Sequence, residues 1–153
     1  MSEVASPTEP CLACDIAAGT RTLAGGILLR DGGFAVHALA GEIALRARRL
    51  DDAVGHFQAG VAIEDGMRYE EPPLWYYSLR QSLGRALLEA GRPADAEAAY
   101  REDLKKFPEN GWSLFGLAQA LRAQGKLGDA APVEARFRRA WAGADVTLEA
   151  SRF

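Results

Sequence analysis

Long apolar runs are absent from this chain, and no stretch approaches the roughly 18 uninterrupted apolar residues of a transmembrane helix. The first ten residues, MSEVASPTEP, hold two acids and two prolines, so neither a signal peptide nor a membrane anchor is expected. Positive charge is not in excess either. The formal net charge is −3 and the pI is near 5.4, which argues against nucleic-acid binding through a general positive field. We therefore expect a cytoplasmic protein with neither a membrane nor a nucleic-acid partner.

Cysteine and histidine are scarce, with two of each. Cys11 and Cys14 lie together in a chain without an export signal, so a metal or redox role is more plausible than a disulfide framework. One Cys-x-x-Cys supplies two of the four ligands of a tetrahedral zinc site. His37 is the candidate third ligand, and the fourth would be His56, a carboxylate or a partner chain. The competing interpretation is two reduced thiols packed in a short N-terminal helix.

What the sequence does contain is a repeat. Three segments align without gaps: GEIALRARRLDDA from Gly41, GRALLEAGRPADA from Gly84 and AQALRAQGKLGDA from Ala118. Gly91 and Gly125 show that the second and third are 34 positions apart. This period is typical of two antiparallel helices joined by a tight turn.

The aligned positions within the three segments have physical reasons. A small residue begins each segment and lets the two helices of a pair approach closely. Gly91 and Gly125 stand where a helix ends and the chain needs a positive φ, whereas Arg48 replaces this glycine in the first segment. Phe57 and Tyr100 supply a large side chain four residues after the alanine that opens each second helix.

The unit from Tyr77 to Pro108 resembles a tetratricopeptide repeat. The residues that carry the resemblance are Leu83, Gly84, Ala96, Tyr100 and Pro108. It implies an all-α, right-handed helical-repeat array of about three helix pairs, and a protein-binding module rather than an enzyme. Residues 41–153 also resemble the C-terminal part of larger bacterial repeat proteins.

The predicted repeat domain covers residues 37–153. Its units span 37–66, 77–108 and 111–142, and residues 143–153 are predicted to cap the exposed apolar end of the array. The extra length between the first two units contains Pro72 and Pro73, which exclude a helix there. This connector delivers Trp75 and Tyr76, either as a partner-binding edge or as side chains that pack the connector onto the array.

Residues 1–36 lack the repeat pattern. Two short apolar runs, Gly26–Arg30 and Phe34–His37, flank a glycine-containing turn and predict a β-hairpin. Residues 34–40 fit the first turns of a helix equally well, and we favour the helix. The opening CLACDIAAG resembles the start of histidine-triad hydrolases, with residues 36–39 at the end of their second strand. Their His-x-His-x-His run is missing, so the resemblance implies an inactive nucleotide-binding remnant without a nucleophile.

The leading helices of such arrays line the concave face, where partner segments bind. The register places six candidate partner-binding residues on this face: Gln81, Arg85, Trp112, Phe115, Gln119 and Arg122. Arg85 and Arg122 would hold an acidic segment of a protein or peptide, with Trp112 as an aromatic anchor. The competing interpretation is a solvated helix face. A homodimer that covers the irregular first unit is the alternative to a peptide-binding monomer.

Overall fold

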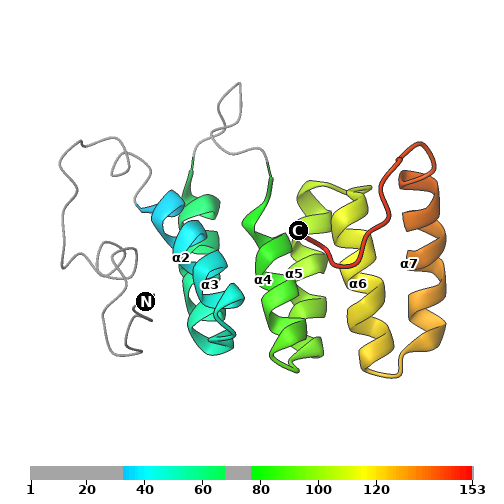
Figure 1. Ribbon diagram of the computed structural model, residues 1–153. Coiled ribbons are helices and arrows are strands. Elements are labelled where there is room, and N and C mark those ends of the chain that lie inside the picture. The colour runs from blue at the N-terminus through cyan, green and yellow to red at the C-terminus, as the bar shows by residue number, and fades with distance from the viewer. Residues whose placement is uncertain (1–32, 68–76, 153) are drawn as a thin grey trace, which may run out of the picture.

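The computed structural model describes residues 33–67 and 77–152. Within them lie six helices and no strand: α2 (Phe34–Arg46), α3 (Leu50–Gly66), α4 (Leu79–Glu89), α5 (Pro93–Lys106), α6 (Gly111–Ala123) and α7 (Leu127–Ala140). They form three antiparallel pairs side by side (Figure 1). The predicted all-α helical-repeat array is confirmed. In these two stretches, no helix has the length and apolar character needed to cross a membrane.

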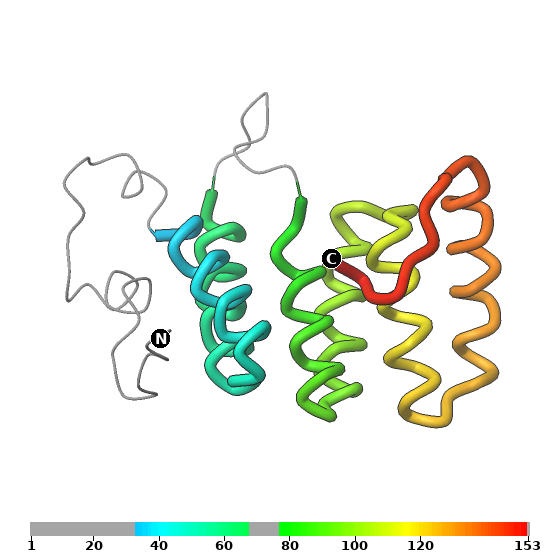
Figure 2. The backbone as a smooth tube through the Cα atoms, viewed as in Figure 1, coloured from blue at the N-terminus to red at the C-terminus, as the bar shows by residue number. Residues whose placement is uncertain are grey.

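Each leading helix contacts the next one, α2 with α4 and α4 with α6, so the three form one continuous surface (Figure 2). The trailing helices connect the pairs from behind, because α3 packs on α4 and α5 packs on α6. A helical hairpin cannot bury its apolar side alone, and stacking the pairs produces one shared core. This surface of α2, α4 and α6 is the one on which a partner was predicted to bind.

Small residues on the leading helices allow the close pairing within a unit. A Cβ atom added to Gly41 would lie 2.5 Å from the Phe57 ring, and one added to Gly84 would lie 2.3 Å from the Tyr100 ring. Both rings are fully buried. The aligned glycines and aromatic residues of the repeat are therefore contact partners, as their register implies.

The turn inside each pair follows one geometry. Gly91 and Gly125 have φ values of 71° and 74°, and Arg48 takes the same left-handed conformation at 60°. In the second pair, the Arg92 amide donates to the Leu87 carbonyl at 2.8 Å, which closes a Schellman motif after α4. The first pair therefore keeps the turn of the repeat without the glycine that favours it.

The helical alternative for residues 34–40 is the one that the structure adopts, since α2 begins at Phe34. The second hairpin strand predicted over Phe34–His37 is therefore wrong, and so is the strand that the histidine-triad resemblance assigned to residues 36–39. Gly33 has a φ of 86° and turns the chain into the helix. Phe34, Ala38 and Leu45 are buried along α2.

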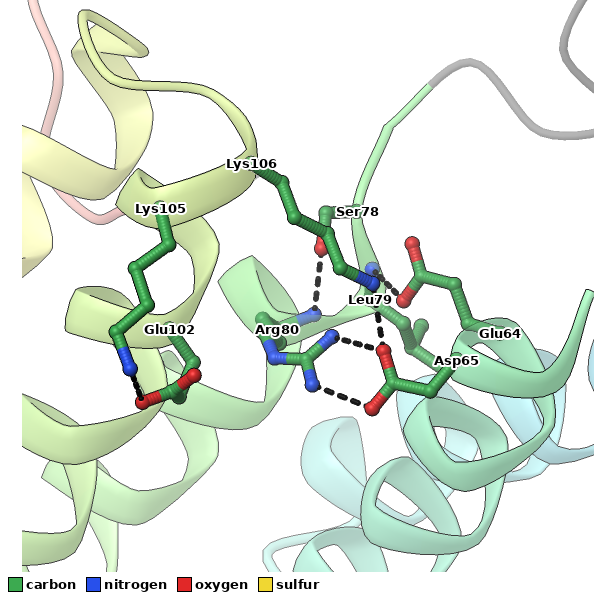
Figure 3. Close-up of polar contacts among 8 residues, drawn as sticks. All are labelled: Glu64, Asp65, Ser78, Leu79, Arg80, Glu102, Lys105 and Lys106. Atoms are coloured by element: carbon green, nitrogen blue, oxygen red, sulfur yellow. Dashed lines mark hydrogen bonds and ion pairs between the residues drawn. The ribbon is translucent and has the colours of Figure 1, made fainter. Parts of the chain in front are cut away.

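Ionic contacts fix the first pair to the second (Figure 3). Arg80 donates to both carboxylate oxygens of Asp65, at 2.9 Å and 2.6 Å, and Lys106 donates to the same carboxylate at 2.6 Å. Beside them Glu64 accepts the Leu79 amide at 3.1 Å at the start of α4. The end of α3 is thus tied to α4 and α5, which aligns the leading helices across the junction.

The C-terminal segment, residues 146–152, does not follow its predicted path over the exposed end of the array. It runs back from α7 across α6 to α4, on the surface of the leading helices (Figures 1 and 2). Trp141, which follows α7, packs edge-on against Trp112 with ring centroids 5.3 Å apart. On the surface of the leading helices the segment is held by hydrogen bonds of Ser151 and Arg152 with groups of α4 and α5.

Candidate partner-binding groove

The C-terminal segment lies in a groove across α4 and α6, and Ser151 anchors it there. The residue is only 1% exposed, and its Oγ lies 2.5 Å from the Tyr100 hydroxyl and 3.2 Å from the Gln81 carbonyl oxygen. A serine hydroxyl has one proton, so Ser151 donates to Gln81 and accepts from Tyr100. Burial raises the pKa of Tyr100, which keeps this phenol protonated and able to donate.

Tyr100 reaches the concave face from the trailing helix α5 because two glycines leave room for its ring. A Cβ on Gly84 of α4 would lie 2.3 Å from the ring, and a Cβ on Gly116 of α6 would lie 2.2 Å from it. The ring therefore passes between two adjacent leading helices. Its hydroxyl, which meets Ser151, is presented to a segment that lies across both helices.

Two arginines hold the end of the segment. Arg85 donates from Nη1 to the Arg152 carbonyl at 3.1 Å and from Nε to Glu89 at 2.9 Å. The Arg152 guanidinium lies 3.5 Å from the centre of the Tyr77 ring, a cation–π contact. A main-chain carbonyl and a cation are both features that a different segment of similar sequence would supply.

Hollows flank the C-terminal segment along the groove. One of about 260 Å³ lies between Arg85, Trp112 and residues 146–150, and one of about 360 Å³ is bordered by Gln119 and residues 149–151. A third, of about 330 Å³, lies past Arg152 against α2. The surface of the third includes two exposed apolar side chains, Leu39 and Ile43. The segment thus fills only part of the groove.

The predicted binding residues divide between two places. Arg85 and Trp112 border the hollows beside the C-terminal segment, whereas Gln81 is buried and contributes its carbonyl to Ser151. Phe115 and Arg122 line a separate hollow of about 250 Å³ between α6 and α7. Gln119 borders both a hollow beside the C-terminal segment and the hollow between α6 and α7.

Arg85 and Arg122 therefore do not form one carboxylate clamp. Arg122 instead pairs with Glu134 of α7, with 2.6 Å between Nε and Oε1. In the same hollow the Phe115 ring packs against Phe137, with centroids 5.3 Å apart.

Four other predicted site residues lie outside the described residues: Trp75, Tyr76, Cys11 and Cys14. His37, the predicted third zinc ligand, is partly buried on α2, and its Nδ1 lies 3.3 Å from Nδ1 of His56. Ser151 and Arg152 belong to no periodic pattern, so sequence reasoning missed them. The sequence signal that could have indicated part of this site is Gly116 of α6, one turn before Gln119. A glycine there makes room for Tyr100 on a second leading helix.

Stacked helix pairs whose leading helices present a shared groove define a helical-repeat protein. Residues 82–145 match the family model of the tetratricopeptide repeat, so the chain carries a tetratricopeptide repeat segment, as predicted. No curated protein and no solved structure matches the chain. The matched residues include most of α4 and all of α5, α6 and α7, the helices that carry Tyr100, Arg85 and Trp112. Tetratricopeptide repeats are generally protein–protein interaction modules.

Proposed function

We propose that the protein binds an extended segment of a partner protein across α4 and α6, in the groove that its own residues 146–152 occupy. The observation that carries this proposal is the burial of Ser151 between Tyr100 and the Gln81 carbonyl. A segment without regular secondary structure is already accommodated there through hydrogen bonds and a cation–π contact. A partner segment of matching chemistry would displace it.

The contacts define the sequence that such a partner segment would carry. The Tyr100 hydroxyl and the Gln81 carbonyl suit a small hydroxyl side chain that both accepts and donates. The next side chain would be a cation over the Tyr77 ring, and Arg85 would bind the main-chain carbonyl of that residue. We therefore expect the partner segment to carry a serine or threonine followed by an arginine or lysine. This replaces the acidic segment that was predicted from Arg85 and Arg122.

The C-terminal segment acts as a built-in competitor. A short tether holds it near the groove at an effective concentration on the order of 1 mM. A partner segment with a dissociation constant well below this concentration would be needed to displace it, so the occupied groove selects against weak binders.

A labelled peptide with the sequence ADVTLEASR, residues 144–152, tests this binding by fluorescence anisotropy. The full-length Ser151→Leu variant should bind the peptide. A leucine does not fit between Tyr100 and the Gln81 carbonyl and cannot hydrogen-bond with them, so the variant's own segment would leave the groove open. The wild type should bind the peptide at least about tenfold more weakly, because its own segment competes. Adding Arg85→Ala to the Ser151→Leu chain should weaken binding, whereas Arg139→Ala, an exposed arginine on α7, should not.

Two results would contradict the proposal. One is the absence of peptide binding to a Ser151→Leu chain that keeps its helical content by circular dichroism. The other is equal binding to the wild type and the variant, which would place the peptide outside the occupied groove.

A further inference from the structure

The hollow of about 330 Å³ against α2 lies where the described part of the C-terminal segment stops. Leu39 and Ile43 stand one turn apart on α2 and form its apolar side, and they are 57% and 39% exposed. Single exposed apolar residues are ordinary, whereas apolar side chains grouped in a hollow are typical of a binding surface. This end of the groove therefore has the character of a binding site.

The hollow continues the groove that the C-terminal segment occupies. Arg152 borders both this hollow and the one of about 260 Å³ beside residues 146–150. Its guanidinium lies over the Tyr77 ring, and that ring forms another side of the hollow against α2. Consecutive Cα atoms are about 3.8 Å apart, so a large side chain directly after this cation can extend toward Leu39 and Ile43.

The size of the hollow suits a large side chain. An apolar cavity of about 150 Å³ already holds a benzene ring. The hollow against α2, at about 330 Å³, therefore has room for a phenyl ring or a branched aliphatic side chain.

The charges at the rim of the hollow favour an uncharged occupant. Glu42 and Arg46 of α2 carry opposite charges, so the rim selects neither a cation nor an anion. The Glu42 carboxylate also accepts the Ser82 hydroxyl at 2.9 Å, a hydrogen bond that joins α2 to α4. Apolar side chains surrounded by a polar rim are the usual arrangement of a protein interface.

We propose that the partner segment carries a large apolar residue directly after its cation, and that this side chain docks on Leu39 and Ile43. The inference rests on the proposed function, because it adds a third position to the segment bound across α4 and α6. The chain's own sequence has the same order of residue types in Ser151, Arg152 and Phe153, of which Phe153 lies outside the described residues. The first helix pair, outside the residues that match the family model, thereby becomes part of the binding surface.

Two peptides that differ in one side chain test this docking by fluorescence anisotropy. They are ADVTLEASRF, residues 144–153, and its Phe153→Ala analogue, both labelled and both with an amidated C-terminus. The receptor is the full-length chain with Ser151→Leu and Phe153→Ala, so that these two residues of its own segment do not compete. The phenylalanine peptide should bind about tenfold more tightly, because its ring leaves water against Leu39 and Ile43.

The ratio of the two affinities locates the contact. Adding Leu39→Ala and Ile43→Ala to the receptor should reduce the ratio to less than about threefold, because the apolar side of the hollow is then removed. Leu127→Ala, at an exposed leucine that begins α7, is the matched control and should leave the ratio unchanged. Circular dichroism checks that each receptor keeps its helical content.

A crosslinking measurement needs no change to α2. With a benzophenone side chain in place of the phenylalanine, the irradiated peptide should crosslink to residues 39–46. Crosslinks to α6 or α7 alone would overturn the docking on α2.

The outcomes separate this docking from segment binding itself. If neither peptide binds, the groove takes no such segment, and both this inference and the proposed function are wrong. If both peptides bind equally, or if the ratio survives Leu39→Ala and Ile43→Ala, segment binding stands and the docking on α2 is wrong. A double variant that changes the oligomeric state but not the ratio would show that a second copy covers this face, which also overturns the docking.

Discussion

At the scale of single residues, Arg48 is the position where the chain departs from its own repeat. It takes a φ of 60° at the turn where the other two pairs have glycine. The left-handed conformation costs a residue with a Cβ about 1–2 kcal/mol, and glycine loses part of this advantage through the greater entropy of its unfolded chain. We expect Arg48→Gly to be more stable than Arg48→Ala by about 1 kcal/mol, measured by urea denaturation.

The Arg48→Ala variant is the matched reference because both substitutions remove the ion pair with Glu89. That pair has a separation of 2.5 Å, but the Arg48 side chain is 68% exposed, so its contribution to stability is small. An alanine variant as stable as the glycine variant would show that the turn carries no conformational strain.

Gly116 is a second residue whose role depends on a single contact. A methyl group there would overlap the Tyr100 ring, 2.2 Å away, and would displace the hydroxyl that binds Ser151. We expect Gly116→Ala to lower the free energy of unfolding by about 1–3 kcal/mol. Gly55, in the middle of α3, has open space around its Cβ position, and Gly55→Ala should raise stability by about 0.5–1 kcal/mol. Thermal and urea denaturation of both variants would measure this contrast, and a shift of the same sign in both would contradict it.

At the scale of helices, the junction between α3 and α4 depends on Asp65. Two hydrogen bonds from Arg80 hold the pKa of Asp65 at about 2, with a smaller contribution from Lys106. The Arg80 side chain is 11% exposed but Asp65 is 41% exposed, so solvent screens part of the interaction. We expect Asp65→Asn to lower the free energy of unfolding by about 1–2 kcal/mol at neutral pH, measured by urea denaturation.

The pH dependence of this difference has a definite sign. Asp65 ionises near pH 3.8 when unperturbed and near pH 2 in the folded protein. Its contribution is therefore complete above pH 3.8 and declines as the pH falls toward 2. The gap between wild type and Asp65→Asn should narrow below pH 3.8, and a gap that stays constant there would place the effect in packing instead.

The helices themselves were largely predictable because their signals are local and repeated. Gly91 and Gly125 mark the turns, and Gly84 and Tyr100 occupy fixed positions of a known period, so the register of α4–α7 followed from sequence. Residues 34–40 were ambiguous because Phe34, Val36 and Ala38 fit both the helical and the strand period. Packing of α2 against Phe57 resolved that ambiguity, and a single-sequence pattern does not contain that contact.

The groove was predicted less well than the helices. Arg85 and Trp112 border a hollow beside the C-terminal segment, on the helix surface that the repeat register predicts for them. The course of residues 146–152 depends on Ser151 meeting Tyr100, two residues with no periodic relation. Such a contact is decided by the assembled surface, so the sequence indicated a terminal cap where the structure has an occupied groove.

At the scale of the whole molecule, the C-terminal segment adds a link between the second and third pairs, which also meet through helix packing and through side-chain contacts such as Ser113–Asp103 and Lys126–Glu97. It leaves the third pair after α7 and is fixed to the second pair through Tyr100 and the Gln81 carbonyl. In repeat arrays each unit contacts only its neighbours, so terminal units can unfold separately. The segment adds a connection that opposes separate unfolding of α6 and α7.

Ser151→Leu should therefore weaken the cooperativity of unfolding as well as the stability. We expect its urea transition to broaden, with a lower m value, because α6 and α7 would unfold before α4 and α5. Hydrogen exchange should show faster exchange in α6 and α7 at urea concentrations where α4 is still protected. Ser151→Ala removes the hydroxyl without adding bulk and should shift the midpoint with little change in m. If Ser151→Leu also shifts the midpoint at constant m, then the other contacts between the two pairs are enough to couple them, and the segment serves only to fill the groove.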